Sequence, residues 1–165
     1  MSTAKQTDDD VPWLTPGELR AWLSVVDLLI KLPWAIDTQL QRDSGLSMSE
    51  YMAMAMLSGA PQRTMRMSEL AKAANASLSR LSHLVKRLEQ RAWIRREQDS
   101  VDARVTNAIL TDAGMAALSA AAPGHVRGVR KLVLDSLPAG HLRRLAQDAT
   151  AITAAIIADH ATACP

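Results

Sequence analysis

The feature that most constrains the fold is a change of hydrophobic period between residues 68 and 110. Ser68–Ala74 and Ser77–Arg91 have the spacing of two helices, separated by a brief turn at Asn75-Ala76. Ser68 and Ser77 are the expected N-caps of these helices. After them, Trp93–Glu97 and Val105–Leu110 have the pattern of two short strands. A helix, a turn, a second helix and a β-hairpin in this order predict a winged helix-turn-helix.

Further helices are expected on both sides of this segment, so the chain is predicted to be mainly α-helical. Ser47-Met48-Ser49-Glu50 has the form of a capping box and predicts a helix that continues to about Ser58. Thr111 is expected to cap a helix that runs to about Ser136, with a bend at Pro123-Gly124. The other predicted segments are a disordered tail over residues 1–12, a helix over Pro16–Arg42 that Pro33 should kink or interrupt, and a last helix over Ala139–His160.

The helix predicted over Ser77–Arg91 separates its residues into two faces when they are placed about 100° apart. The apolar face consists of Leu78, Leu81, Leu84, Val85 and Leu88. The polar face consists of Ser79, Arg80, His83, Lys86, Arg87 and Gln90. Short hydroxyls at the start of such a helix, including Ser77, allow close approach to base edges, and Arg80 or His83 can donate to guanine. Lys86 and Arg87 suit phosphate contacts; a solvated face of an ordinary helix is the alternative.

Charge is concentrated in the same part of the chain. Residues 63–104 contain ten Lys and Arg against five Asp and Glu, a net charge of +5, although the whole chain carries only +2. The hairpin places Arg104 near its tip, where an arginine can enter the minor groove of DNA. Asp102 is expected to pair with Arg104 and orient it. The alternative is a surface ion pair that only holds the turn.

These residues resemble the signature of the MarR family of winged helix-turn-helix transcriptional regulators. The resemblance is carried by Asp102-Ala103-Arg104, by Leu110-Thr111 with Gly114, and upstream by Ser68–Ala71 and Ser77–Ile94, and it covers about residues 16–160. Two positions depart from the pattern. Ala92 stands where the family commonly has glycine, and Ser100 where a proline is often found. A left-handed Ala92 would cost about 1 kcal/mol.

The resemblance implies one MarR-type domain over residues 1–165 and a homodimer. Residues 46–111 would form the winged helix-turn-helix lobe, and residues 16–42 and 112–160 the dimerisation helices. A twofold dimer predicts a pseudo-palindromic operator with half-sites about 34 Å apart. The expected action is repression by occupying a promoter. The alternative for the apolar residues of the terminal helices is a core within one chain.

Many relatives sense small aromatic acids between the dimerisation helices and the DNA-binding lobe. The matching segments here contain six candidate pocket residues, Trp22, Trp34, Tyr51, Met52, Met56 and His125. Tryptophan and methionine suit an adaptable apolar pocket for an aromatic or phenolic effector. The alternative is that the same residues belong to the core.

Other functional classes have little support in the sequence. It contains no phosphate-binding glycine loop, no nucleophile elbow and no zinc-binding His-Glu-x-x-His, so we expect no enzyme, no metal and no cofactor. No apolar run is long enough for a membrane span, and Cys164 is the single cysteine, so we expect a cytoplasmic protein. The remaining alternative is a helical, dimeric protein-interaction module without operator binding.

Overall fold

The structure is a computed structural model that describes residues 11–163, with side chains up to Asp159. The predicted tail over residues 1–12 lies outside the described residues except for Val11 and Pro12, and Cys164 lies outside them as well. The chain divides into two compact units, one ending at Ala35 and the other beginning at Ile36.

The first unit contains most of helix α1, which spans Pro16–Ser44. Thr15 and Glu18 begin this helix with a reciprocal pair of hydrogen bonds between side chain and backbone, at 2.7 and 3.3 Å. The helix is continuous through Pro33, so the expected interruption does not occur. Proline removes one backbone donor, and the turns on either side still form. Large apolar side chains of the helix are exposed in this unit: Leu19, Trp22, Leu23, Val25, Leu28, Leu29, Ile30 and Trp34.

The second unit begins with the last turns of α1 and continues into three shorter helices. They are α2 (Met48–Gly59), α3 (Met67–Ala73) and α4 (Leu78–Gln90). The predicted capping box is confirmed: the Ser47 hydroxyl accepts from the Glu50 amide, and the Glu50 carboxylate accepts from the Ser47 amide. The predicted N-cap of α3 at Ser68 is wrong. The N-cap position is occupied by Arg66, two residues earlier, because a short strand leads directly into the helix.

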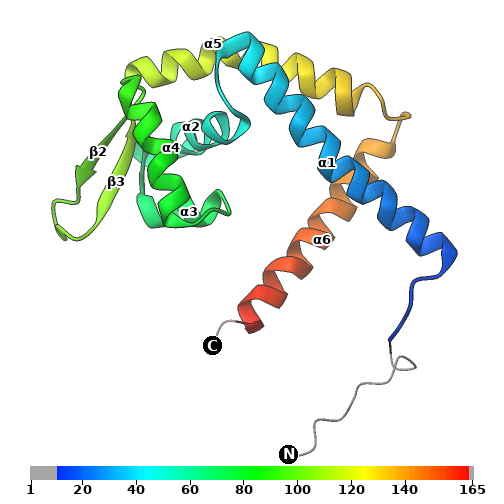
Figure 1. The fold of residues 1–165 in the computed structure, drawn as a ribbon. Coiled ribbons are helices and arrows are strands. Elements are labelled where there is room, and N and C mark those ends of the chain that lie inside the picture. Colours follow the sequence, from blue (N-terminus) through cyan, green and yellow to red (C-terminus); the bar gives the residue numbers. More distant parts are fainter. Residues whose placement is uncertain (1–10, 164–165) are drawn as a thin grey trace, which may run out of the picture. The chain divides into compact units, whose positions relative to one another are not determined.

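That strand is β1 (Thr64–Arg66), which the sequence did not reveal. The predicted hairpin is confirmed as β2 (Ile94–Gln98) and β3 (Thr106–Leu110), and the three strands form an antiparallel sheet in the order β1-β3-β2. Ile94 lies opposite Leu110, and Gln98 opposite Thr106. Figure 1 shows the hairpin extending beside α4 with its tip free of the helices of this lobe.

The core of the second unit lies in the winged lobe, which we define as residues 46–111, together with the end of α1. The side chains that are almost completely buried come from α1, the residues before α2, the helices α2 to α4, and β2: Leu40, Leu46, Met54, Leu57, Leu70, Leu81, Val85, Leu88 and Ile94. Helix α2 packs against α4, α5, β1 and β3. The lobe therefore completes a hydrophobic core within one chain.

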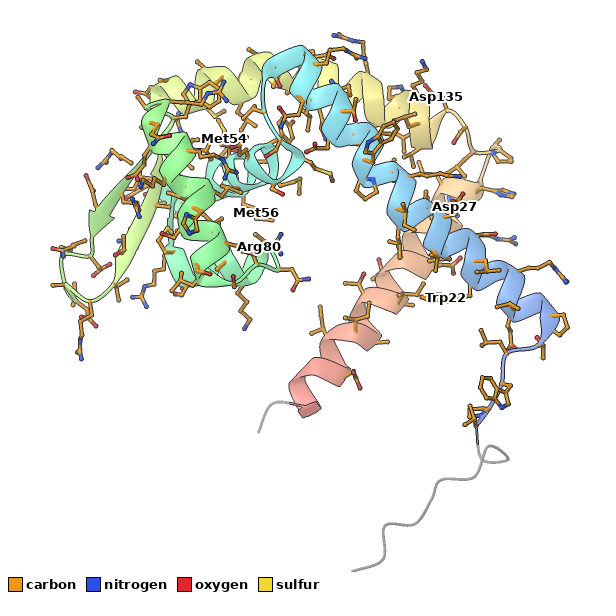
Figure 2. The ribbon with its side chains drawn as sticks, viewed as in Figure 1. Trp22, Asp27, Met54, Met56, Arg80 and Asp135 are labelled. Atoms are coloured by element: carbon orange, nitrogen blue, oxygen red, sulfur yellow. The ribbon has the colours of Figure 1, made fainter. Side chains whose placement is uncertain are left out.

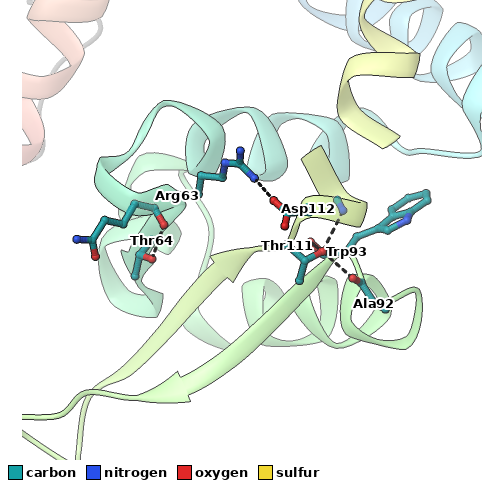
Figure 3. A network of polar contacts seen from close by, with 8 residues as sticks. Arg63, Thr64, Ala92, Trp93, Thr111 and Asp112 are labelled. Carbon is teal, nitrogen blue, oxygen red and sulfur yellow. Dashed lines mark hydrogen bonds and ion pairs between the residues drawn. The ribbon is translucent and has the colours of Figure 1, made fainter. Parts of the chain in front are cut away.

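A compact corner joins the winged lobe to the helix α5 (Asp112–Val129), as Figure 3 shows. The Thr111 hydroxyl caps α5 by accepting from the Gly114 amide at 3.0 Å, and it donates to the Ala92 carbonyl at 2.7 Å. A Cβ atom added at Gly114 would lie 2.1 Å from the Trp93 carbonyl oxygen. The spacing Leu-Thr-x-x-Gly thus has a physical basis, because the threonine ties two elements together and only glycine permits their approach.

The last helices extend from this corner. Helix α5 is continuous through Pro123 and is followed by a short π-helical segment, Arg130–Leu134. Helix α6 spans His141–Ala163, and every described side chain in it, from His141 to Asp159, is exposed. Across the described part of the chain, no helix has the length and apolar character that crossing a membrane requires.

Candidate nucleic-acid interface

The helix α4 has a defined beginning and a defined end. The Ser77 hydroxyl accepts from the Arg80 amide at 3.3 Å, which confirms Ser77 as the N-cap. At the other end, the Trp93 amide donates to the Leu88 carbonyl and the Ala92 amide to the Glu89 carbonyl, as in a Schellman motif. Ala92 has a φ of 57°, so its backbone is left-handed. The conformational cost that the sequence analysis expected for a left-handed alanine therefore applies.

The two faces of α4 separate largely as predicted. Leu81, Val85 and Leu88 are buried in the lobe, and Leu84 is half-buried. The exception is Leu78, which was placed on the apolar face but is 55 % exposed. The helix begins at this residue, and the buried side of α4 starts one turn later, at Leu81.

The polar residues proposed to contact DNA lie at the surface of α4. Ser77, Ser79, Arg80, His83 and Lys86 are all exposed, and Figure 2 labels Arg80 among them. Within the described part of the chain, no carboxylate pairs with Arg80 or Lys86. Their charge is therefore available to a polyanion in solution.

Arg87 differs from the other cations of this face because it is tied to the protein. Its Nε atom donates to the Glu50 carboxylate at 2.9 Å, and its side chain remains 56 % exposed. Burial raises the pKa of Glu50, but hydrogen bonds from Ser47 and Arg87 outweigh burial, so this pKa lies below its ordinary value. Glu50 is thus a charged link between the cap of α2 and the outer face of α4, which the sequence indicated only as part of a capping box.

The tip of the hairpin presents Arg104 to solvent, with its side chain 92 % exposed. The Asp102 carboxylate accepts from both the backbone amide and the Nε atom of Arg104, at 3.0 and 3.2 Å. The pairing of these two residues is therefore present. Because the Arg104 amide holds the Asp102 carboxylate in place, that carboxylate can orient the Arg104 side chain.

Asp99 organises the loop that carries this pair. Its carboxylate accepts from the amides of Val101 and Asp102 and from the Asn107 side chain, at 3.0 to 3.2 Å. These hydrogen bonds, that of Val101 first, hold the pKa of Asp99 below its ordinary value. The sequence analysis did not single out Asp99, although an aspartate at the start of a tight turn is a known signal for such hydrogen bonding.

The arginines of the first wing strand are mostly neutralised. Arg96 pairs with Glu89 of α4 at 2.6 Å, and Arg95 pairs with Glu97 two residues later. The first pair fastens the hairpin to the end of α4. Among the described residues, each of the wing arginines Arg95, Arg96 and Arg104 has a carboxylate partner, whereas Arg80 and Lys86 on α4 have none.

The six candidate pocket residues are distributed over both units. Trp22, which Figure 2 labels, and Trp34 are exposed in the unit that ends at Ala35. In the other unit Tyr51 and His125 are in contact, with ring centroids 4.5 Å apart. Burial lowers the pKa of His125, and its Nδ1 atom is buried with no hydrogen-bond partner among the described residues. Met52 is exposed and Met56 half-buried.

The described residues also form a surface depression away from this interface. This open depression of about 420 Å³ is lined by residues 62–63, 95 and 109–112, and none of the six candidate pocket residues borders it. Its two arginines already pair with carboxylates, Arg63 with Asp112 and Arg95 with Glu97. Among the described residues, no group of His, Cys, Asp and Glu is arranged to hold a metal ion.

Comparisons with known proteins, by sequence and by structure, point to the MarR family. The sequence model of the MarR family matches residues 46–106. The chain is similar to Sco3205, a MarR family transcriptional regulator from Streptomyces coelicolor crystallised in complex with DNA, with 40% identity and a TM-score of 0.83 over 88% of this chain and 91% of that one. It is also similar to AbsC, a MarR family regulator from the same organism, with 34% identity and a TM-score of 0.83 over 90% and 99%.

A third similar structure is more distant in sequence. The transcriptional regulator MOSR of M. tuberculosis, also crystallised with DNA, is 28% identical with a TM-score of 0.67, covering 84% of this chain and 96% of that one. No curated protein matches the chain.

Proposed function

The chain belongs to the MarR family of transcriptional regulators, and on that premise we propose that it binds double-stranded DNA sequence-specifically. The observation that carries the proposal is the joint exposure of two cationic features on one folded lobe. Arg80 and Lys86 are exposed on α4, and Arg104 projects from the hairpin that is fastened to α4 through Arg96. A helix in the major groove and an arginine in the minor groove use this arrangement.

Each residue of the interface has a role in this proposal. Ser77, Ser79, Arg80 and His83 lie in the first two turns of α4, where a recognition helix meets base edges. Lys86 and Arg87 lie further along and suit phosphates, which fix register but do not read sequence. For Arg87, the Nε atom is already held by Glu50, so its terminal nitrogens remain for a phosphate.

The acting form is proposed to be a homodimer formed by the terminal helices. Support comes from α6, whose described residues are all exposed although they include Leu142, Leu145, Ile152, Ile156 and Ile157. Leaving such side chains in water forgoes roughly 1 kcal/mol or more each, so a second chain that covers them would be favoured. Two copies related by a twofold axis would read a pseudo-palindromic operator with half-sites about 34 Å apart.

Repression is proposed to follow from occupying a promoter, and a small aromatic effector to relieve it. Support for an effector comes from His125, whose Nδ1 atom is buried beside the Tyr51 ring and has no hydrogen-bond partner among the described residues. A phenolic or carboxylic group could satisfy that atom while its ring stacks. A panel of benzoic and phenolic acids tests this, because an effector should raise the unfolding temperature and release bound DNA.

The test of DNA binding compares two variants that remove the same charge. Arg104→Ala should weaken binding to the selected operator about tenfold or more, because it removes the wing contact. Arg127→Ala, on the exposed surface of α5, should leave the affinity nearly unchanged. Both should retain the unfolding temperature of the parent chain, since neither side chain is buried.

Salt dependence distinguishes DNA binding from a protein-interaction module. Contacts to several phosphates make affinity fall by orders of magnitude between roughly 50 and 200 mM salt. Fluorescence anisotropy with labelled operator should show this steep dependence. A chain that binds no duplex would have another function. So would a chain whose affinity for the operator is the same in Arg104→Ala as in the parent.

A further inference from the structure

One large apolar side chain of α4 lies outside the core. Leu78 is the first residue of the helix, and it is 55 % exposed, whereas Leu81 one turn later is 1 % exposed. The helical pattern places Leu78 with the buried leucines, but the lobe leaves it uncovered. Because more than half of this side chain stays in water, Leu78 contributes less to stability than a fully buried leucine does, and it remains available for a contact outside the chain.

The neighbours of Leu78 make it the dominant apolar feature of the first turn. Ser77 and Ser79 are exposed on either side, and their hydroxyls lie 3.3 Å from each other. The Ser77 hydroxyl is also engaged as the helix cap, accepting from the Arg80 amide. The first turn therefore offers one bulky hydrocarbon between two short polar side chains, with Arg80 two residues further along the helix.

The major groove contains one complementary group for such a side chain. The 5-methyl group of thymine is the apolar feature of the base edges there, and the other groups are hydrogen-bond donors and acceptors. A leucine placed against those polar groups would leave them without partners, which is unfavourable. A leucine placed against a thymine methyl buries both surfaces and leaves no polar group unpaired.

We propose that Leu78 packs against the 5-methyl group of one thymine in each half-site of the operator, and so helps to specify the sequence. The proposal rests on the proposed DNA binding through α4. Specificity at that base pair comes from an apolar contact, while Arg80 and His83 supply hydrogen bonds to neighbouring positions. Leu78 therefore contributes to the sequence specificity of DNA binding, although the helical period groups it with the buried leucines of α4.

The experiment replaces the thymines of the selected operator, one position at a time, by deoxyuridine. This change removes only the methyl group and keeps every hydrogen-bonding group of the base. At one symmetric position the parent chain should lose roughly fourfold in affinity for each methyl removed, the effect of one buried methyl group. The other thymine positions should show smaller changes.

The variant Leu78→Ala, combined with the deoxyuridine operators, gives a double-mutant cycle between the side chain and the methyl group. It should bind the thymine operator less tightly than the parent chain does, and it should bind the thymine and deoxyuridine operators equally at the sensitive position. Lys86→Ala is the control, because it should bind more weakly while keeping the full preference for the methyl group. Since Leu78 is exposed, the unfolding temperature of Leu78→Ala should match that of the parent.

Two outcomes overturn the inference. One is a parent chain that binds the operator but shows no sensitivity to deoxyuridine at any position. The other is a sensitivity that Leu78→Ala retains in full, which would assign the methyl contact to another side chain. A parent chain that binds no duplex at all would instead overturn the proposed function, so the two failures are distinguishable.

Discussion

The winged lobe and helix α6 differ in the solvent exposure of their large apolar side chains. In the lobe, Leu57, Leu70 and Leu88 are completely buried by neighbours from the same chain. In α6, Leu142 and Ile156 are about half exposed, although they recur at a helical spacing similar to that of the lobe's leucines. The same residue types on the same kind of element thus end in different environments.

This difference agrees with the proposed dimer, in which the lobe buries its apolar side chains within one chain and α6 would bury its own against a second chain. The lobe consists of three helices joined by short connections, two of them capped by serines, and a sheet that packs against them, so it can bury its apolar side chains within one chain. In helix α6 every described residue is exposed, and under the proposed function a second chain would cover its apolar side chains. The stability of α6 would then depend on protein concentration.

The largest expected effect distinguishes the two regions directly. Leu88→Ala should lower the free energy of unfolding by about 4 kcal/mol, because it leaves a cavity in the lobe. Ile156→Asp should leave the stability of the lobe unchanged and should convert a dimer into monomers. Urea unfolding at two protein concentrations and sedimentation velocity measure these outcomes. A loss of lobe stability in Ile156→Asp at every concentration would show that α6 belongs to the same core.

A second prediction concerns the corner that closes the lobe. Gly114→Ala should lower the free energy of unfolding by about 3 kcal/mol, because its Cβ would meet the Trp93 carbonyl oxygen at 2.1 Å and backbone must move. Gly59→Ala is the matched control, since no atom lies within 4 Å of the added Cβ. Thermal unfolding measures both variants. Equal losses of stability in the two would contradict the account.

The third prediction uses the end of α4. Ala92→Gly should raise the free energy of unfolding by about 1 kcal/mol, because Ala92 is held at a φ of 57°, where glycine has no steric penalty. Ala113→Gly, in the first turn of α5, should have the opposite sign and cost about 0.5–1 kcal/mol. Chemical unfolding measures both. A destabilised Ala92→Gly would mean that the Schellman motif at this end is not formed in solution.

The smallest effect concerns pH. Burial lowers the pKa of His125 in the folded chain, so the unfolded chain binds a proton more readily at this residue. Its contribution to stability is therefore complete above the unfolded pKa of about 6.5 and is lost as the pH falls toward the folded pKa. The loss of stability from pH 7.5 to 5.5 should be smaller in His125→Gln than in the parent. His83→Gln, at an exposed position on α4, should keep the parent's dependence.

Local signals were enough to predict most of the lobe. The capping serines and threonine at residues 47, 77 and 111 act over three or four residues, and each begins a helix where the sequence placed it. The hairpin was predicted from alternating residues within two short segments. The Asp102–Arg104 contact lies within a single turn. In each case the residues that determine the structure lie near each other in the chain.

The features that the sequence did not reveal depend on distant residues. Strand β1 has three residues and no pattern of its own, and it forms because Met65 pairs with Ala108, more than forty residues away. Arg87 pairs with Glu50 across a similar separation. The exposure of Leu78 is set by where the buried side of α4 begins, which a periodic pattern cannot locate at a helix end.

The most direct test of the account is to select bound sequences from a pool of random duplex DNA with the purified full-length chain. The account predicts an enriched inverted repeat, with half-site centres about one helical turn apart, because two α4 helices related by a twofold axis would read it. It also predicts that Arg104→Ala enriches that repeat weakly or not at all. A pool without enrichment, or an enriched motif without twofold symmetry, would contradict it.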